Sequence, residues 1–125
     1  MARVADAVIS AVLGRRVPAP AALPPGLLPE GVVLRRGRLV PRIGGLLARM
    51  GGPAAAVTLR GTVIVHPAME ATPVLLAHEL THVRQWSADP LFPLRYTWAT
   101  LRHGYHDNPY EVEARAAEAA FASRS

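Results

Sequence analysis

Two histidines and a glutamate lie close together past the middle of the chain, in the order His78-Glu79-Leu80-Thr81-His82. On a helix, residues four apart share a face, so both imidazole rings can point at the same spot. Zinc accepts such a pair of ligands, with Zn–N bonds of about 2.0–2.1 Å. Glu79 follows the first histidine directly and is placed to act as general base toward a water molecule that the metal activates. The motif therefore predicts a metal centre able to hydrolyse a bond.

A catalytic zinc ion needs a third protein ligand, and the end of the chain offers three candidates. Glu111, Glu113 and Glu118 all belong to one predicted helix that is rich in alanine. Small side chains allow such a helix to approach the histidine helix closely. Because Glu111 and Glu113 are two residues apart, they point to nearly opposite sides, and only one of them is expected to face the metal helix. The remaining glutamates are expected on a solvated face, with Arg115 as their partner.

The elements that position these residues follow from helix caps and from the spacing of apolar residues. Thr72 and Asn108 are predicted N-caps, and each is followed by a proline at the first helical position. β-Branched residues on both sides of a turn predict a hairpin. The expected elements, in chain order, are an amphipathic helix over 1–14, a strand over 32–34, a turn around Gly37, a short helix over 43–50, the hairpin over 57–65, and helices over 72–87, 91–103 and 109–123.

The segment 17–31 separates the first predicted helix from the rest of the chain. Its five prolines forbid a regular helix or a central strand, so we expect an arm that packs over the surface. The order of helix, arm, short strands and three helices indicates an α+β fold, with a short sheet or hairpin packed on the histidine helix and two further C-terminal helices. We expect one compact domain, in which 1–30 form the helix and arm and 31–125 form the metal-binding part.

The composition excludes several other kinds of chemistry. The chain has no cysteine, which excludes a disulfide framework, a thiolate metal site and a cysteine nucleophile. All 14 basic residues are arginine, and the lack of lysine excludes Schiff-base and P-loop lysine chemistry. Half of the 125 residues are hydrophobic, so the chain can bury a core and lacks the composition of a disordered protein.

The net charge of +5 bears on partners and location. A basic stretch is present, with Arg35, Arg36, Arg38, Arg42 and Arg49. Neither interleaved aromatic residues nor a recognisable reading helix accompanies it, so no nucleic-acid partner is expected. Ordinary solvated arginine is the favoured interpretation, followed by contact with an acidic substrate or a lipid.

No apolar stretch reaches the roughly 18 residues that cross a bilayer, so we expect a cytoplasmic protein whose apolar N-terminal helix could lie on a membrane or a partner.

Two stretches of the chain resemble gluzincin-type H-E-x-x-H metallopeptidases, and most of all small, mostly uncharacterised bacterial domains of that type. They are HELTHVRQW over 78–86 and LRHGYHDNPYEVEAR over 101–115. The resemblance covers about 55–121 and none of the first 54 residues. It implies a small zincin-like domain that holds one Zn²⁺ ion through His78, His82 and a downstream glutamate.

The resemblance also implies which glutamate is the ligand. In such enzymes the ligand begins a short run that ends in an acid or amide, and the matching run here starts at Glu111 and ends at Arg115. The acid or amide commonly orients a histidine ligand, so another group must do so in this chain. The candidates are Asp107, Asn108, Glu113 and backbone carbonyls.

A peptidase of this type also needs a donor for the developing oxyanion, often a tyrosine or histidine. Tyr105 and His106 are the preferred pair, because they precede the ligand helix in a turn that can lean over the metal. The competing interpretation buries Tyr105 in the core and leaves His106 in solvent. The hairpin over 57–65 could provide an edge strand for a peptide substrate. The remaining aromatic and histidine side chains are expected in the core or a hydrophobic wall, namely Trp86, Phe92, Tyr96 and Trp98, or in a surface turn, namely His66.

Together these observations predict a zinc-dependent metallopeptidase that acts on a peptide or protein substrate, with a possible partner protein completing the cleft. His78, His82 and Glu111 are the expected ligands, and Glu79 is the expected base, with Tyr105 and His106 as donors. The alternative is a non-catalytic zinc-binding domain that serves as a protein-interaction or regulatory module, since a bound metal contributes to the stability of a small domain.

Overall fold

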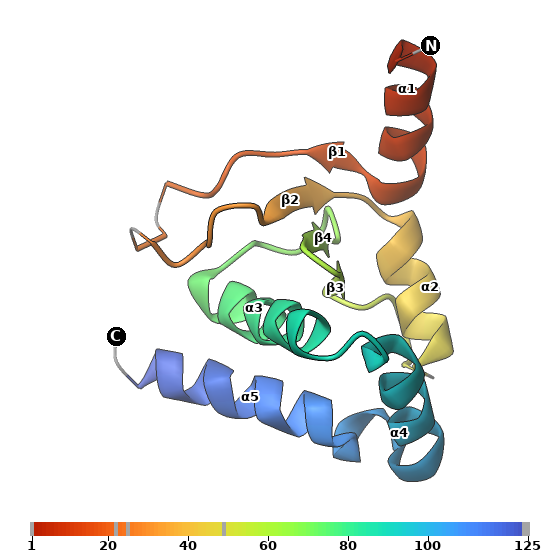
Figure 1. The fold of residues 1–125 in the computed structure, drawn as a ribbon. Coiled ribbons are helices and arrows are strands. Elements are labelled where there is room, and N and C mark those ends of the chain that lie inside the picture. Colours follow the sequence, from red (N-terminus) through yellow and green to blue (C-terminus); the bar gives the residue numbers. More distant parts are fainter. Residues whose placement is uncertain (1, 22, 25, 49, 124–125) are drawn as a thin grey trace.

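The computed structural model describes residues 2–21, 23–24, 26–48 and 50–123. In this part of the chain the elements form a small α+β fold, as the sequence predicts (Figure 1). None of the helices described there is both long and apolar enough to cross a bilayer. The elements are α1 (Ala2–Leu13), β1 (Arg15–Arg16), β2 (Val33–Arg36), α2 (Leu39–Leu47), β3 (Ala56–Leu59), β4 (Thr62–Val65), α3 (Pro73–Ala88), α4 (Phe92–Asp107) and α5 (Pro109–Ala122).

The four strands form one mixed sheet in the order β1-β2-β4-β3. β2 and β4 run parallel, whereas β1 pairs with β2 and β3 pairs with β4 in antiparallel fashion. The β3–β4 hairpin turns at Arg60 and Gly61, as the β-branched residues on both sides predict. β3 therefore forms one edge of the sheet, and its outer side has no partner strand among the described residues.

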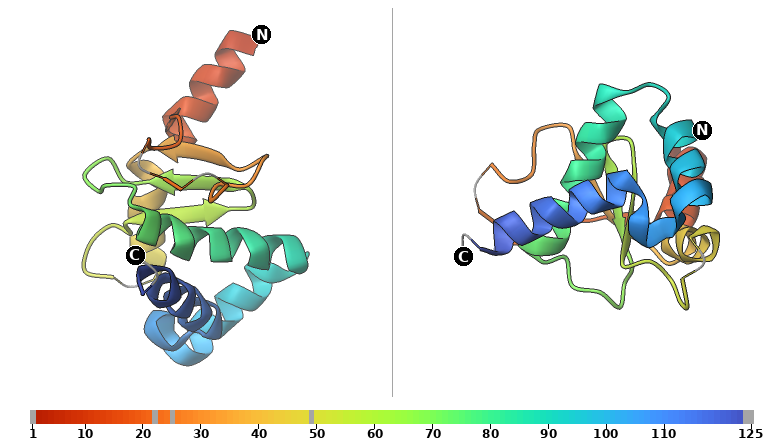
Figure 2. Two further views of the ribbon diagram at one scale, coloured as in Figure 1. Left: turned by 90° about the vertical axis from the view of Figure 1, so that its left-hand side faces the viewer. Right: turned by 90° about the horizontal axis from the view of Figure 1, so that it is seen from below.

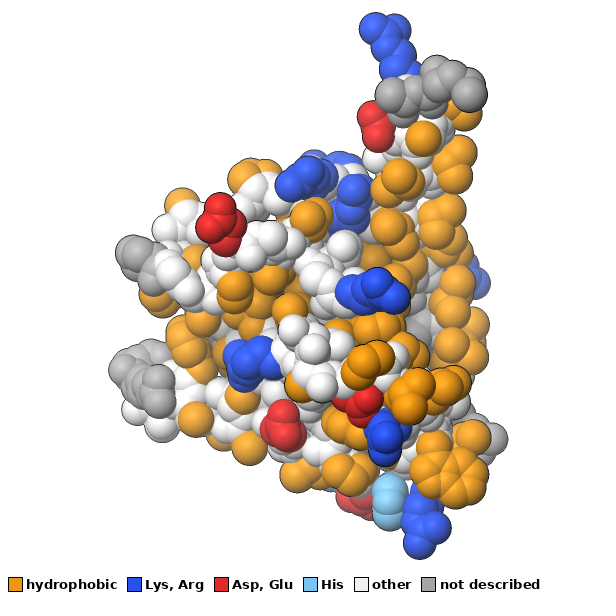
Figure 3. Space-filling view, viewed as in Figure 1, with side chains coloured by type: hydrophobic (Ala, Val, Ile, Leu, Met, Phe, Trp, Pro, Cys, Tyr) orange, Lys and Arg blue, Asp and Glu red, His pale blue; other side chains and the backbone are white. Residues whose placement is uncertain are grey.

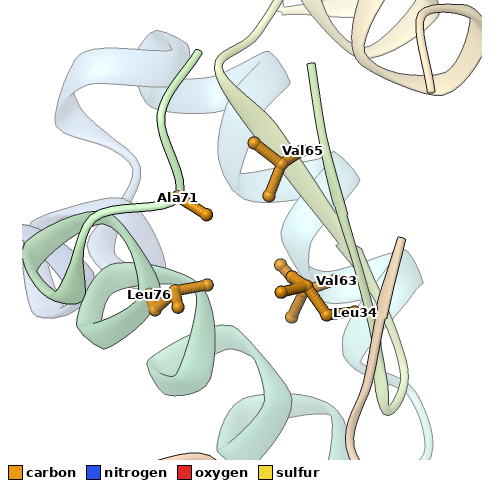
Figure 4. Close-up of a cluster of buried hydrophobic side chains, with 5 residues drawn as sticks. All are labelled: Leu34, Val63, Val65, Ala71 and Leu76. Atoms are coloured by element: carbon orange, nitrogen blue, oxygen red, sulfur yellow. The ribbon is translucent and has the colours of Figure 1, made fainter. Parts of the chain in front are cut away.

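The hydrophobic core lies between the sheet and the start of α3. Leu34, Val63 and Val65 point from the strands toward Ala71 and Leu76, and all five side chains are buried (Figure 4). Burial of an aliphatic side chain of this size stabilises a fold by about 1.5–3 kcal/mol. The core therefore holds α3 against the sheet in a fixed place.

α2 covers the opposite face of the sheet beside β3. Val57 and Thr58 are neighbours on this strand, so their side chains point to opposite faces. Thr58 faces α3, whereas Val57 faces α2. A Cβ atom on Gly44 would lie 2.8 Å from Cγ2 of Val57, so the absence of a side chain at Gly44 permits this close approach.

The last two helices, α4 and α5, pack against the histidine helix α3 on the side away from the sheet. α4 is interrupted at Gly104, where φ is 80° and ψ is 168°, a conformation that glycine adopts readily. The break turns the chain so that α5 packs along α3 (Figures 1 and 2). Asn108 caps α5, because its Oδ1 accepts from Tyr110 N at 2.9 Å, and its Nδ2 donates to Tyr96 O at 3.3 Å and Thr100 Oγ1 at 2.9 Å. This one side chain therefore joins α4 to α5.

Several elements differ from the predicted ones, including the helix predicted over 91–103, which continues past Gly104 to Asp107 and so contains Tyr105 and His106. β2 extends through Arg36, because its register with β1 and β4 holds Arg35 and Arg36 in the sheet rather than in a turn. The short strand β1 was not predicted, since two exposed arginines carry no apolar alternation. α2 begins at Leu39 and accommodates Pro41 in its first turn, where a backbone N–H has no helical partner to lose.

The arginines of the basic stretch have different surroundings. Arg35 donates to the carbonyl of Gly14 at 2.8 Å, and Arg36 donates to that of Met69 at 2.7 Å. These two side chains therefore hold backbone segments rather than extending into solvent. Arg38 and Arg42 are exposed, as predicted, whereas Arg49 lies outside the described residues.

Candidate metal centre

His78 and His82 from α3 meet Glu111 from α5. The ligand atoms of the three side chains lie within 4.8 Å of one another. Nε2 of His78 is 3.0 Å from Oε1 of Glu111, and Nε2 of His82 is 3.1 Å from Oε2 of the same carboxylate. The Glu111 side chain is only 3% exposed, and both imidazoles are largely covered. The group could hold a metal ion.

Local sequence features place the three side chains. Thr72 caps α3 by accepting from Leu75 N at 3.1 Å, which fixes the start of the helix one turn before the histidines. Glu111 lies in the first turn of α5, directly after the Asn108 cap. Ala114, fully buried one turn further on, keeps α5 close enough to α3 for a glutamate to reach both imidazoles.

Gln85 determines which nitrogen of His82 faces the centre. Its Nε2 donates to Tyr110 O and to Glu113 Oε1, both at 3.1 Å, and neither atom can donate in return. Oε1 of Gln85 is therefore the atom that meets Nδ1 of His82, at 2.8 Å. Because an amide oxygen only accepts, His82 Nδ1 carries a proton. Nε2 of His82 thus faces Glu111 with its lone pair available for a metal.

Glu118 acts in the same way on the other histidine. Oε2 of Glu118 lies 3.3 Å from Nδ1 of His78, and a carboxylate accepts the proton of that nitrogen. Nε2 of His78 is therefore turned toward Glu111 as well. The Glu118 side chain is 37% exposed, so water competes for this contact more than it does for the buried contact at His82.

The donor set fits a transition metal better than a hard cation. Two imidazole nitrogens and one carboxylate are the protein ligands of many catalytic zinc sites, which keep a further position for water or substrate. Calcium and magnesium prefer oxygen ligands alone. The hydroxyl of Tyr96 donates to Oε2 of Glu111 at 2.5 Å, which fixes the orientation of the carboxylate.

Protein charges also favour a bound cation here. Burial lowers the pKa of both imidazoles, but hydrogen bonding to Glu111 and the charges of Glu79 and Glu111 outweigh this effect. The pKa of His78 is therefore raised, and the pKa of His82 is raised to about 9. Burial alone would raise the pKa of Glu111, but its bonds to the two histidines hold it well below its usual range. Protons and a metal ion therefore compete for the same nitrogens.

Glu79 lies beside this group but makes a different contact. The hydroxyl of Thr58 on β3 donates to Oε2 of Glu79 at 2.7 Å. Trp86 holds the strand in place, since its Nε1 donates to Thr58 O at 3.2 Å. Burial raises the pKa of Glu79, although the nearby histidines and the Thr58 bond oppose the shift. Glu79 is thus a buried carboxylate with increased basicity.

A pocket of about 480 Å³ opens beside the three-residue group. That volume lies in the range of small-molecule and peptide side-chain pockets, about 300–1,000 Å³. Glu79, His82 and Glu111 line it together with Tyr105. Most of its other lining is apolar and comes from the end of α2, the strand β3 and the helix α4.

The two predicted donors have different surroundings. Tyr105 lines the pocket, and burial together with the negative charge of Glu111 raises the pKa of its hydroxyl. The side chain of His106 is exposed and is absent from the described lining of the pocket, whereas its carbonyl accepts from Arg115. His66 lies in a turn, where its Nδ1 accepts from Ala68 N at 3.0 Å, as predicted.

Several roles were missed by the sequence analysis. Among the candidates named to orient a histidine ligand, Glu113 contributes only indirectly, by accepting from Gln85, whereas Gln85 and Glu118, which contact the histidines themselves, were not among those candidates. Tyr96 and Trp98 were both expected in the core or a hydrophobic wall, whereas the hydroxyl of Tyr96 donates to Glu111 and Trp98 is exposed. The sequence does contain an indication that Tyr96 faces the interior. Tyr96 follows the buried Phe92 by four residues, a spacing that puts both rings on one face of α4.

The chain matches no protein-family model, no curated protein and no solved structure. Its resemblance to the gluzincin-type metallopeptidases therefore rests on the two motifs alone.

Proposed function

We propose that the protein is a zinc-dependent metallopeptidase. The observation that carries this proposal is the position of Glu79, a buried carboxylate that lines the same pocket as His82 and Glu111. His78, His82 and Glu111 would hold the metal through two Nε2 atoms and one carboxylate. When bound, a zinc ion supplies Lewis acidity, which polarises a carbonyl oxygen and lowers the pKa of water toward neutrality.

Glu79 acts as the general base. Thr58 holds one oxygen of its carboxylate by a hydrogen bond, so the other oxygen is the one that takes a proton from the attacking water. Because burial raises the pKa of Glu79, the group accepts this proton more readily than an exposed glutamate does. It then passes the proton to the amine that leaves.

Two further features of the pocket suit a peptide. Tyr105 keeps its hydroxyl proton at neutral pH, because its pKa is raised, and donates it as a hydrogen bond to the developing oxyanion. β3 forms both a wall of the pocket and the edge of the sheet, so an extended peptide can add to it through main-chain hydrogen bonds.

The variant Glu79→Gln tests the proposal. It keeps the size of the side chain and removes the base together with its buried charge, so we expect zinc content near that of the wild type and thermal stability at least as high. Cleavage of a mixture of synthetic peptides, followed by mass spectrometry, should fall by about 10²–10⁴-fold. Glu70→Gln is the matched control, because Glu70 is exposed and absent from the described lining of the pocket, and it should cleave at the wild-type rate.

Two results would count against the enzyme. Equal cleavage by wild type and Glu79→Gln would remove the base from the mechanism. A zinc-loaded wild-type protein that cleaves no peptide in the mixture would instead favour the alternative, a non-catalytic zinc domain that binds a partner.

A further inference from the structure

Two helices that border the pocket carry apolar side chains on their outer sides. On α4, Leu94, Trp98 and Leu101 follow at a spacing of four and three, so they share one face, and each is at least 64% exposed. On α2, Leu46 and Leu47 are 70% and 77% exposed, and the more N-terminal members of the same stripe are also exposed. Monomeric proteins rarely leave so many large apolar side chains together in water.

The two stripes meet at the pocket. Leu47 at the end of α2 and Leu101 on α4 are both exposed and both line it. α1, α2 and α4 lie along the right-hand side of the molecule in Figure 1 and in the right-hand view of Figure 2. Figure 3 shows their apolar side chains as a band along the right-hand edge of the molecule. We call the exposed apolar side chains of these three helices the apolar face: Val4, Val8, Ile9, Val12, Leu39, Ile43, Leu46, Leu47, Leu94, Trp98 and Leu101.

The charges around the apolar face are mostly positive. Asp6 on α1 and Asp107 at the end of α4 are acidic, and Asp89 pairs with Arg95 of α4 at 2.8 Å. No aspartate or glutamate occurs in 31–69, which includes α2, or in 90–106, which includes the rest of α4. Arg42 on α2 and Arg102 on α4 are exposed, so the flanks of the pocket combine apolar side chains with a net positive charge.

We propose that the apolar face docks on an anionic lipid bilayer. Leucine, valine and tryptophan side chains insert at the boundary between headgroups and acyl chains, and arginines pair with lipid phosphates. A second copy of this chain fits less well, because a symmetric contact through α2 and α4 would bring arginines together, and the one acidic residue of these two helices, Asp107, lies at the very end of α4. The charge of the face thus selects the lipid.

Docking in this way has a consequence for the substrate, and that consequence rests on the proposed function. Because Leu47 and Leu101 belong to both the apolar face and the pocket, the pocket opens where the protein meets the lipid. A polypeptide held at the membrane surface is then the substrate that reaches Glu79 most directly. The apolar walls of the pocket would take one of its hydrophobic side chains.

The docking can be tested with the full chain and vesicles. Wild type should sediment with phosphatidylglycerol vesicles and stay in solution with phosphatidylcholine vesicles. Leu46→Glu and Leu94→Glu lie outside the lining of the pocket, and each should weaken sedimentation at least about tenfold, because each removes an inserted side chain and adds a repelled charge. Met69→Glu is the matched control, since Met69 is exposed in the β4–α3 connection, away from the right-hand edge in Figure 1, and should sediment like wild type.

Fluorescence gives an independent readout. The chain has two tryptophans, and the exposed one is Trp98. Its emission should shift to shorter wavelength with phosphatidylglycerol vesicles, and Trp98→Phe should abolish the shift while the protein still sediments. Glu79→Gln should sediment like wild type, so the failure of the proposed enzyme would leave this result unchanged.

Three outcomes would overturn the docking proposal. Wild type could remain in solution with phosphatidylglycerol vesicles. Leu46→Glu and Leu94→Glu could sediment as well as Met69→Glu. Analytical ultracentrifugation could also show a wild-type dimer that the two leucine variants dissociate, which would make the face a contact between copies of the chain.

Discussion

Replacing Gln85 by methionine should weaken zinc binding although Gln85 is not a ligand. The change keeps a side chain of similar volume and removes the oxygen that accepts from His82 Nδ1 at 2.8 Å. Without that acceptor, nothing selects the ring orientation and tautomer that present Nε2 to Glu111. The lost contact is a buried hydrogen bond, which is worth about 1–3 kcal/mol when one partner is left unsatisfied. Since about 1.4 kcal/mol is tenfold in affinity, zinc binding should weaken by about 10–100-fold.

A comparison with Glu118→Gln sharpens the prediction. Glu118 contacts His78 at a longer distance, 3.3 Å, and its side chain is 37% exposed, so water can take over as acceptor. The expected loss of zinc affinity for Glu118→Gln is therefore below about tenfold, smaller than that for Gln85→Met. Gln85→Glu keeps an acceptor for His82 Nδ1 and should recover part of the affinity that methionine loses.

The assay is a competition titration with a chromophoric zinc chelator at neutral pH, together with thermal unfolding of each variant. Unfolding separates loss of the site from loss of the fold. We expect the fold to persist, because Gln85 Nε2 contacts a backbone carbonyl that belongs to α5, that of Tyr110, and the exposed carboxylate of Glu113, which can turn to water. Wild-type affinity in Gln85→Met would refute the reasoning, as would a larger loss in Glu118→Gln.

Two predictions concern the packing that brings Glu111 to the histidines. Asn108→Ala removes the α5 cap and two bonds to α4, so chemical denaturation should show about 2–4 kcal/mol less stability, and an unchanged midpoint would contradict the role of this side chain. Ala114→Leu places a large side chain in the fully buried contact between α3 and α5, so the free energy of unfolding should fall by about 1–3 kcal/mol, and zinc affinity should fall with it. Ala116→Leu, at an exposed position, is the control that should change neither quantity.

The ligand helices were predictable because their signals are local. Thr72 with Pro73 begins α3, and Asn108 with Pro109 begins α5. In both cases the N-cap side chain accepts a hydrogen bond from a free backbone N–H of the first turn, and the proline fixes a helical φ at the first position. The two histidines four apart need no information beyond the helix itself to share a face.

The contacts around the ligands were not predictable in the same way. Glu118 reaches His78 only after α5 has packed on α3, and the spacing of residues in either helix does not determine the angle and offset of that packing. Gln85 follows His82 by three residues on the same helix, so its proximity is local, but the direction of its amide depends on Tyr110 and Glu113 of α5. Glu113 shows why counting residues around a helix is insufficient, since a glutamate side chain is long enough to bend toward a neighbour that its Cβ does not face. β1 likewise exists only because β2, distant in sequence, offers it an edge.

Glu79 is the residue that separates a catalytic metal site from a structural one. A structural site needs ligands and the groups that orient them, and His78, His82, Glu111 and Gln85 already supply these. Glu79 adds a further buried carboxylate, which destabilises the folded state because its pKa is raised by burial. Thr58 compensates only in part, through one hydrogen bond. A buried base whose charge is only partly compensated, and which lines a pocket beside three convergent ligands, is explained by a reaction that uses it.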